Sequence, residues 1–87
     1  MIITTTKSFD KETSKLHRKI QDELIKKLAI FSVNPFDLSL YNHKLKGHLK
    51  KFRSIKINGD YRLIYEDLGN NSVRLLRIGT HSELYGK

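Results

Sequence analysis

The 87-residue chain contains no cysteine, no tryptophan and a single proline. Without cysteine it can form neither a disulfide framework nor a thiolate metal site. No apolar run approaches the roughly 18 residues that a bilayer span requires, and the first residues lack the charged-then-apolar order of a signal peptide. We therefore expect a single cytoplasmic domain over residues 1–87, with no membrane partner.

Acidic residues are also scarce. Nine Asp and Glu stand against 17 Lys and Arg, which gives a formal net charge of +8. The excess is concentrated between His43 and Arg62, where seven basic side chains meet one aspartate, a net +6. Clustered positive charge favours a polyanion as partner, above all the phosphates of a nucleic acid. A surface that merely keeps the protein soluble is the alternative.

The hydrophobic pattern predicts an α+β fold. From residue 10 to 31 apolar side chains recur every third or fourth position, which predicts one long N-terminal helix. Asn58-Gly59 is a strong hairpin signal between two strand-like segments. We expect a small antiparallel sheet of about four strands, with the helix and room for a second short helix at 36–41 packed on one face. The predicted strands lie within residues 1–8, 52–57, 61–66 and 73–79.

Several kinds of functional site have no support in the sequence. The chain lacks the GxxxxGK[ST] loop of nucleotide-binding proteins and the G-x-S-x-G elbow of acyl-transfer enzymes. Its four histidines do not show the spacing of a zinc site. We therefore expect no metal and no cofactor.

The residues that remain suit metal-free cleavage of RNA. RNA carries its own nucleophile, the 2′-hydroxyl, so an enzyme needs a base, an acid and fixed positive charge. Histidine can play either proton role near neutral pH. His81 and Tyr85, in the terminal segment RIGTHSELYGK, follow the last predicted strand, and the basic hairpin precedes it.

Two longer segments resemble a known family. HKLKGHLKKFRSIKINGDYRLIYE and LLRIGTHSELYG resemble the RelE-like toxins of bacterial toxin–antitoxin pairs, and within them the YafQ branch. The resemblance implies a RelE-like fold and a ribosome-dependent mRNA endonuclease that arrests translation. Its products would be a 2′,3′-cyclic phosphate and a 5′-hydroxyl. It also implies that mRNA, the ribosome and a cognate antitoxin are partners, with a toxin–antitoxin hetero-oligomer as the inactive form.

The resemblance also indicates which residues form the site. His81, His43 and Asp60 stand at active-site positions of YafQ-like toxins, and Tyr85 stands where these toxins keep an aromatic residue. Ser54 and Lys56 occupy positions where YafQ-type members have an aspartate and a histidine, so the identity of the general base stays open. The expected catalytic residues are His81, His43, Arg62, Lys56, Tyr85 and Asp60, and the expected RNA-binding residues are Arg53, Arg77, Lys44, Lys46, Lys50 and Lys51.

Ordinary structural roles compete with several of these assignments. Arg62 could pair with Glu66 or Asp60, and Asp60 could be only a turn residue. Arg77 could point away from His81.

Two other functions fit the same fold. One is a non-catalytic inhibitor of DNA gyrase like the ParE toxins, although ParE-like chains generally lack the histidine after the last strand. The other is a toxin that has lost catalysis, which Ser54 keeps open.

Overall fold

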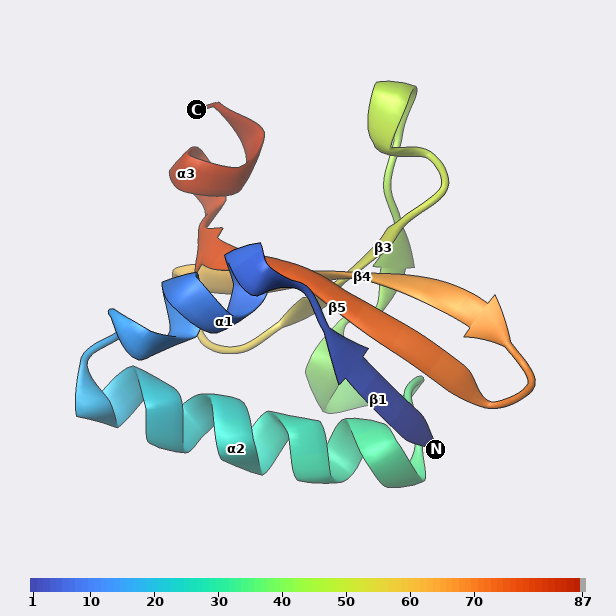
Figure 1. Cartoon of the computed structure of the whole chain (residues 1–87), viewed down its shortest axis with the longest axis horizontal. Coiled ribbons are helices and arrows are strands. Elements are labelled where there is room, and N and C mark those ends of the chain that lie inside the picture. Colours follow the sequence, from blue (N-terminus) through green and yellow to red (C-terminus); the bar gives the residue numbers. More distant parts are fainter. Residues whose placement is uncertain (87) are drawn as a thin grey trace.

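The sheet has five strands (Figure 1). The computed structural model describes residues 1–86, so Lys87, the last residue of the predicted domain, lies outside the described residues. The strand order is β1-β5-β4-β3-β2; β1 runs parallel to β5, and the other neighbours are antiparallel. The α+β prediction is confirmed, but the predicted number of about four strands was too low. The strand that was not predicted is β2, which is only two polar residues long. The strands are β1 (Ile2–Thr5), β2 (His43–Lys44), β3 (Arg53–Lys56), β4 (Tyr61–Gly69) and β5 (Ser72–Thr80).

The predicted long helix is two helices, α1 (Lys7–Ser14) and α2 (Arg18–Val33). His17 interrupts it with an extended ψ of 145°, and its Nδ1 accepts the Lys19 N–H to begin α2. Glu12 explains the break, because its carboxylate accepts the edge N–H of Ile78 at 3.0 Å and holds α1 beside β5. Since α2 crosses one face of the sheet, one straight helix could not both lie beside β5 and cross that face (Figure 1).

The remaining helical segments are short. α3 (His81–Tyr85) follows β5 directly and lies on the other side of the sheet from α2 (Figure 1), and this third helix was not predicted. The 3₁₀ turn η1 (Leu38–Leu40) falls within the predicted turn at 36–41, and η2 (Gly47–Leu49) lies in the connection between β2 and β3. No helix within residues 1–86 is long and apolar enough to cross a membrane.

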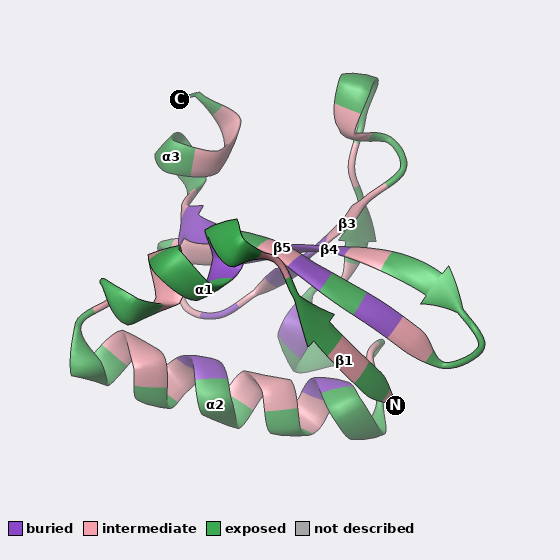
Figure 2. Cartoon of the chain, in the orientation of Figure 1, coloured by how far each residue is buried: buried purple, intermediate pink, exposed green. Residues whose placement is uncertain are grey.

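The hydrophobic core lies between α2 and the sheet. Phe31 of α2 is fully buried and meets Tyr65 of β4 edge to face, with ring centroids 4.8 Å apart. Strand residues at alternate positions point to opposite faces, so Ser54 of β3 lies on the other side from this core. Figure 2 shows the buried residues gathered along the strands and on the inner side of α2. The core residues are Phe9, Leu24, Phe31, Leu40, Ile55, Ile57, Leu63, Tyr65, Val73, Leu75 and Ile78.

The predicted hairpin joins β3 and β4. Asn58 stabilises its turn, since its Oδ1 accepts the N–H groups of Asp60 and Tyr61 at 2.9 and 2.8 Å. The left-handed backbone typical of tight hairpin turns occurs instead between β4 and β5, at Asn70 and Asn71, with φ of 52° and 58°. Both turns fix the register of β4, which carries Arg62.

Candidate functional site

Two arms project from the face of the sheet that α2 leaves free (Figure 1). One arm is α3, and the other is the connection between β2 and β3 that contains η2. A cavity of about 330 Å³ is lined by residues of both. The two histidines implicated by the sequence therefore line one cavity. Its lining is His43, Lys44, Leu45, Lys46, His81 and Tyr85.

A second cavity, of about 450 Å³, adjoins the first at His43. It contains the two cations that the strand pattern places next to each other, Lys56 and Arg62, which are register partners on β3 and β4. We call the two cavities together the His43 groove. The lining of the second cavity is Tyr41, Asn42, His43, Lys56 and Arg62.

His43 is held in one orientation by the backbone. Its Nδ1 lies 2.9 Å from the carbonyl oxygen of Tyr41. A carbonyl can only accept a hydrogen bond, so this contact requires a proton on Nδ1. In the neutral ring Nε2 is then the acceptor, which is the state a general base needs. Tyr41, which supplies this carbonyl, has a left-handed backbone with a φ of 48°.

His81 is the first residue of α3 and its side chain is exposed. Its backbone N–H donates to the carbonyl of Asp60 at 3.1 Å, which joins α3 to the β3–β4 turn. Its ring meets the ring of Tyr85 edge to face, with centroids 4.7 Å apart. Tyr85 in turn donates its hydroxyl hydrogen to Oγ of Ser54 at 3.1 Å.

α3 was not predicted from the sequence, although a signal was present. Thr80 caps the helix by accepting the N–H of Glu83, and the Glu83 carboxylate accepts the N–H of Thr80 at 2.7 Å. This reciprocal pair is a capping box, and its sequence signature of Thr and Glu three residues apart could have predicted a helix start at the end of the last strand.

The two cations of the groove make different contacts. The Lys56 ammonium lies 4.8 Å from the centre of the Tyr41 ring. The Arg62 guanidinium donates to the carbonyls of Asn58 and Tyr61 at 2.7 and 3.1 Å. Among residues 1–86, no ion pair joins Arg62 to Asp60 or Glu66, the ordinary role considered for it. Its positive charge is therefore uncompensated by those two carboxylates.

Arg53 faces the opposite side of the sheet. It is one position out of phase with Lys56, so it shares the core face with Tyr65. Its Nε donates to Asn42 at 2.8 Å, and Asn42 donates to the Tyr65 hydroxyl at 2.7 Å. Burial raises the pKa of Tyr65. Arg53 also lies over the Phe36 ring at 5.2 Å. The structure therefore gives Arg53 a set of packing contacts and does not bring it into the His43 groove.

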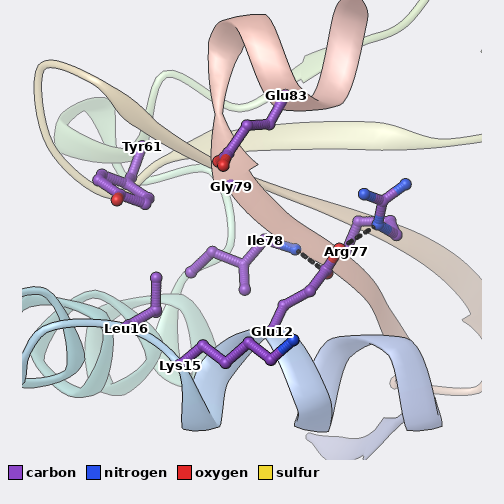
Figure 3. A pocket seen from close by; sticks show the side chains of 8 residues that line it. All are labelled: Glu12, Lys15, Leu16, Tyr61, Arg77, Ile78, Gly79 and Glu83. Carbon is purple, nitrogen blue, oxygen red and sulfur yellow. Dashed lines mark hydrogen bonds and ion pairs between the residues drawn. The ribbon is translucent and has the colours of Figure 1, made fainter.

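Arg77 lines a different cavity, shown in Figure 3. Its Nε donates to the Glu12 carboxylate at 2.6 Å, so its charge is paired across to α1. The cavity has a volume of about 450 Å³, and its two carboxylates balance the charges of Lys15 and Arg77, so it offers no excess positive charge to a phosphate. Arg77 is thus not brought together with His81. The lining residues are Glu12, Lys15, Leu16, Tyr61, Arg77, Ile78, Gly79 and Glu83.

Three predicted residues, Asp60, Lys50 and Lys51, line neither cavity of the groove. The Asp60 side chain is exposed in the β3–β4 turn, and its backbone carbonyl accepts the N–H of His81. Lys50 and Lys51 are exposed at the end of the η2 arm and line neither cavity. Within residues 1–86 there is no group of three or more histidine, aspartate or glutamate side chains that could hold a metal ion.

Comparisons with known proteins show the family and the fold. The family described as "Bacterial toxin of type II toxin-antitoxin system, YafQ" matches residues 1–86. No curated protein matches the chain significantly. Among solved structures, YafQ from E. coli strain BL21(DE3) is 26% identical with a TM-score of 0.79, and the alignment covers 97% of each chain.

Of two further similar structures, one is a toxin–antitoxin complex and the other comes from a second organism. The E. coli DinJ–YafQ toxin–antitoxin complex is matched at 26% identity and a TM-score of 0.75, over 97% of this chain and 96% of that one. A copper-bound mutant toxin from Helicobacter pylori is 31% identical with a TM-score of 0.70, over 98% of this chain and 99% of that one. With the family match spanning nearly the whole sequence, the chain belongs to the YafQ family of toxins of bacterial type II toxin–antitoxin systems.

Proposed function

We propose that this toxin is an endoribonuclease that cleaves mRNA on the ribosome without a metal ion. One observation carries the proposal: the His43 groove combines two histidines with two cations, Lys56 and Arg62, on one open face. A phosphodiester in the groove would have a proton acceptor, a proton donor and positive charge around it. These are the groups that attack by the 2′-hydroxyl requires.

His43 acts as the general base in this proposal. Its Nδ1 is committed to the Tyr41 carbonyl, so the Nε2 lone pair takes the proton of the 2′-hydroxyl. The 2′-oxygen then forms a bond to phosphorus, and the bond from phosphorus to the 5′-oxygen breaks. His81, in its protonated form, gives its proton to that leaving oxygen. The products are a 2′,3′-cyclic phosphate and a 5′-hydroxyl, and no other reactant is consumed.

Lys56 and Arg62 stabilise the charge that builds on the phosphate during the attack. They are register partners on neighbouring strands, so both can reach one phosphate from the floor of the groove. Each proton-transfer group contributes roughly 10²–10⁴ in rate. A preorganised positive donor contributes about 10²–10³. Asp60 contributes through its backbone, because its carbonyl holds the first residue of α3.

The lysines around the groove dock the RNA of the ribosome and the message. Lys44 and Lys46 line the groove itself, and Lys50 and Lys51 extend the positive surface to the end of the η2 arm. Phosphate contacts of this kind give affinity without sequence preference, and they weaken as salt is raised. Arg53 and Arg77, which have protein partners, contribute less to RNA binding in this proposal.

An antitoxin silences the toxin by occupying this positive face. The YafQ structure with DinJ is a toxin–antitoxin complex and supports a cognate partner for this chain. A partner of opposite charge would be attracted to the net +8 of the chain and would compete with RNA for the groove.

The test is cleavage of a message on purified ribosomes by the wild type and by His81→Gln. We expect loss of about 10²–10⁴ in rate, because glutamine cannot donate the proton. His48→Gln is the matched control, since His48 is exposed on the η2 arm and lines neither cavity. The new 5′ ends should accept a labelled phosphate from a kinase directly, as 5′-hydroxyls do.

Three outcomes would overturn the proposal. The first is undiminished cleavage by His81→Gln. The second is loss of wild-type cleavage in phenanthroline, which binds transition metals but leaves the Mg²⁺ that ribosomes need. The third is products that carry 5′-phosphates. Induction in cells separates the nuclease from a gyrase inhibitor, because immediate translation arrest supports cleavage of mRNA and a DNA-damage response supports the inhibitor.

A further inference from the structure

Ser54 is unusual among the residues that face the groove side of the sheet. It is a polar residue, yet its exposed fraction is 0%. Its Oγ accepts the hydroxyl hydrogen of Tyr85 at 3.1 Å, a contact between β3 and the C-terminal helix 31 residues further along the chain. A buried polar group is stable only when it is hydrogen-bonded, so this contact fixes where the Tyr85 ring lies.

The Tyr85 ring in turn lies against His81. The two ring centroids are 4.7 Å apart at an interplanar angle of 61°, an edge-to-face contact on consecutive turns of α3. Because the Tyr85 hydroxyl is directed at the sheet, it is already committed to a protein partner. The hydroxyl of Tyr85 is therefore badly placed to give a proton to a substrate, and its ring is well placed to orient the imidazole.

Two other contacts seat α3 on the sheet. A Cβ at Gly79 would lie 3.0 Å from Oε1 and 3.4 Å from Cβ of Glu83, so the helix approaches β5 as closely as a residue without a side chain permits. The backbone N–H of His81 donates to the Asp60 carbonyl. A helix of five residues cannot be stable alone, so its position depends on such contacts. The Ser54–Tyr85 hydrogen bond is a contact of this kind at the C-terminal end of α3.

We propose that Ser54 and Tyr85 form a latch that holds α3 against the sheet and fixes the His81 ring in the His43 groove. Both are positioning residues, and neither exchanges a proton with the substrate. The effect on catalysis rests on the function proposed above, whereas the latch itself can be measured without RNA.

The experiment compares Ser54→Ala, Tyr85→Phe and the double variant in the full-length protein. Tyr61→Phe is the control, since Tyr61 is also half-buried but lines the cavity of Figure 3. NMR measures hydrogen exchange of the Gly86 amide, which donates to the Ser82 carbonyl at 2.9 Å, and the ring signals of His81. A neutral hydrogen bond corresponds to roughly a two- to tenfold change in an equilibrium. We expect exchange to accelerate by about that factor in both single variants, with the His81 signals shifted.

Cleavage kinetics complete the test. We expect kcat to fall roughly two- to tenfold with KM unchanged in each single variant, and the double variant to be no worse than either, because both remove the same bond. Unchanged exchange and unchanged His81 signals would overturn the latch. A fall in kcat for Tyr85→Phe but not for Ser54→Ala would show that the hydroxyl itself takes part in the reaction, which also overturns it. A wild type that does not cut RNA would overturn the proposed function alone, since the NMR result would still decide the latch.

Discussion

The two faces of strands β3 and β4 differ in burial: one face forms the core, and the other lines the His43 groove. On the face covered by α2, Ile55 and Leu63 have exposed fractions of 0%. On the other face, their neighbours Lys56 and Arg62 are half-buried and line the His43 groove. One face is closed by a helix of 16 residues, and the other is covered only in part by a helix of five and by the η2 arm.

The difference shows how a chain of this size can be both stable and open. Burial of apolar side chains under α2 supplies the stabilisation, at about 25 cal/mol for each Å² removed from water. The groove face can then keep exposed histidines and a cation, Arg62, that neither Asp60 nor Glu66 pairs. Changes on the two faces should therefore separate into effects on folding and effects on RNA cleavage.

The largest effect on folding should come from Phe31→Ala. Phe31 is fully buried and packs on Tyr65, so its truncation leaves a cavity in the core. We expect the free energy of unfolding to fall by about 3–5 kcal/mol, measured by denaturant titration. Ile25→Ala, on the outer side of α2 with an exposed fraction of 65%, should change it by less than about 0.5 kcal/mol.

Equal losses in these two variants would contradict the assignment of stability to the α2 face. If Phe31→Ala does not fold, Phe31→Leu creates a smaller cavity and gives a graded value.

Arg53 and Lys56 test the separation of the two faces within one strand. Lys56→Ala should slow cleavage by about 10²-fold, because it removes positive charge from the groove, and should leave stability nearly unchanged. Arg53→Ala should do the reverse. It leaves the Asn42 Oδ1 without its partner, so we expect a loss of about 1–2 kcal/mol of folding free energy and near-normal cleavage of RNA by the protein that remains folded.

Paired measurements of unfolding and of single-turnover cleavage decide this comparison. A strong loss of cleavage in Arg53→Ala at unchanged stability would mean that RNA wraps around both faces of the sheet. Such a result would restore Arg53 to the set of RNA-binding residues expected from charge alone.

Much of the α2 face could be read from the sequence. The apolar spacing of Leu24, Leu28 and Phe31 predicts the buried side of α2, and strand alternation identifies Leu63 and Tyr65. The break at His17 could not be read, because the apolar period continues across it. The break depends on Glu12 reaching the edge of β5, a contact between residues 66 positions apart.

The groove face was harder to predict. Alternation correctly separates Arg62 from Leu63, and it could also have separated Arg53 from Lys56. Arg77 could not be assigned, since a bulge shifts the register of β4 and β5 between Ile64 and Tyr65, and only the fold shows α1 beside it. His81 and His43 line one cavity because two arms with no regular apolar period bring them there. Only the resemblance to known toxins predicted that both histidines belong to one site.

The smallest expected effect lies where the two faces meet, at η1. Leu40 of η1 is fully buried in the core, whereas the next residue, Tyr41, is exposed in the groove. Asp37 begins this turn by accepting hydrogen bonds from the Ser39 hydroxyl at 2.6 Å and from its N–H at 3.0 Å, and these bonds lower the pKa of Asp37.

A carboxyl whose pKa is lower in the folded protein stabilises it above the unfolded value, about 3.9, and loses that contribution as pH falls through the folded value. Asp37→Ala should therefore lower Tm at pH 7 by less than the Phe31 and Arg53 variants do, and the difference from wild type should shrink in acid. Asp37→Asn, which can still accept both bonds, is the control and should track wild type more closely at neutral pH. A difference for Asp37→Ala that stayed constant down to pH 2 would show that the turn depends on the shape of the side chain and owes nothing to its charge.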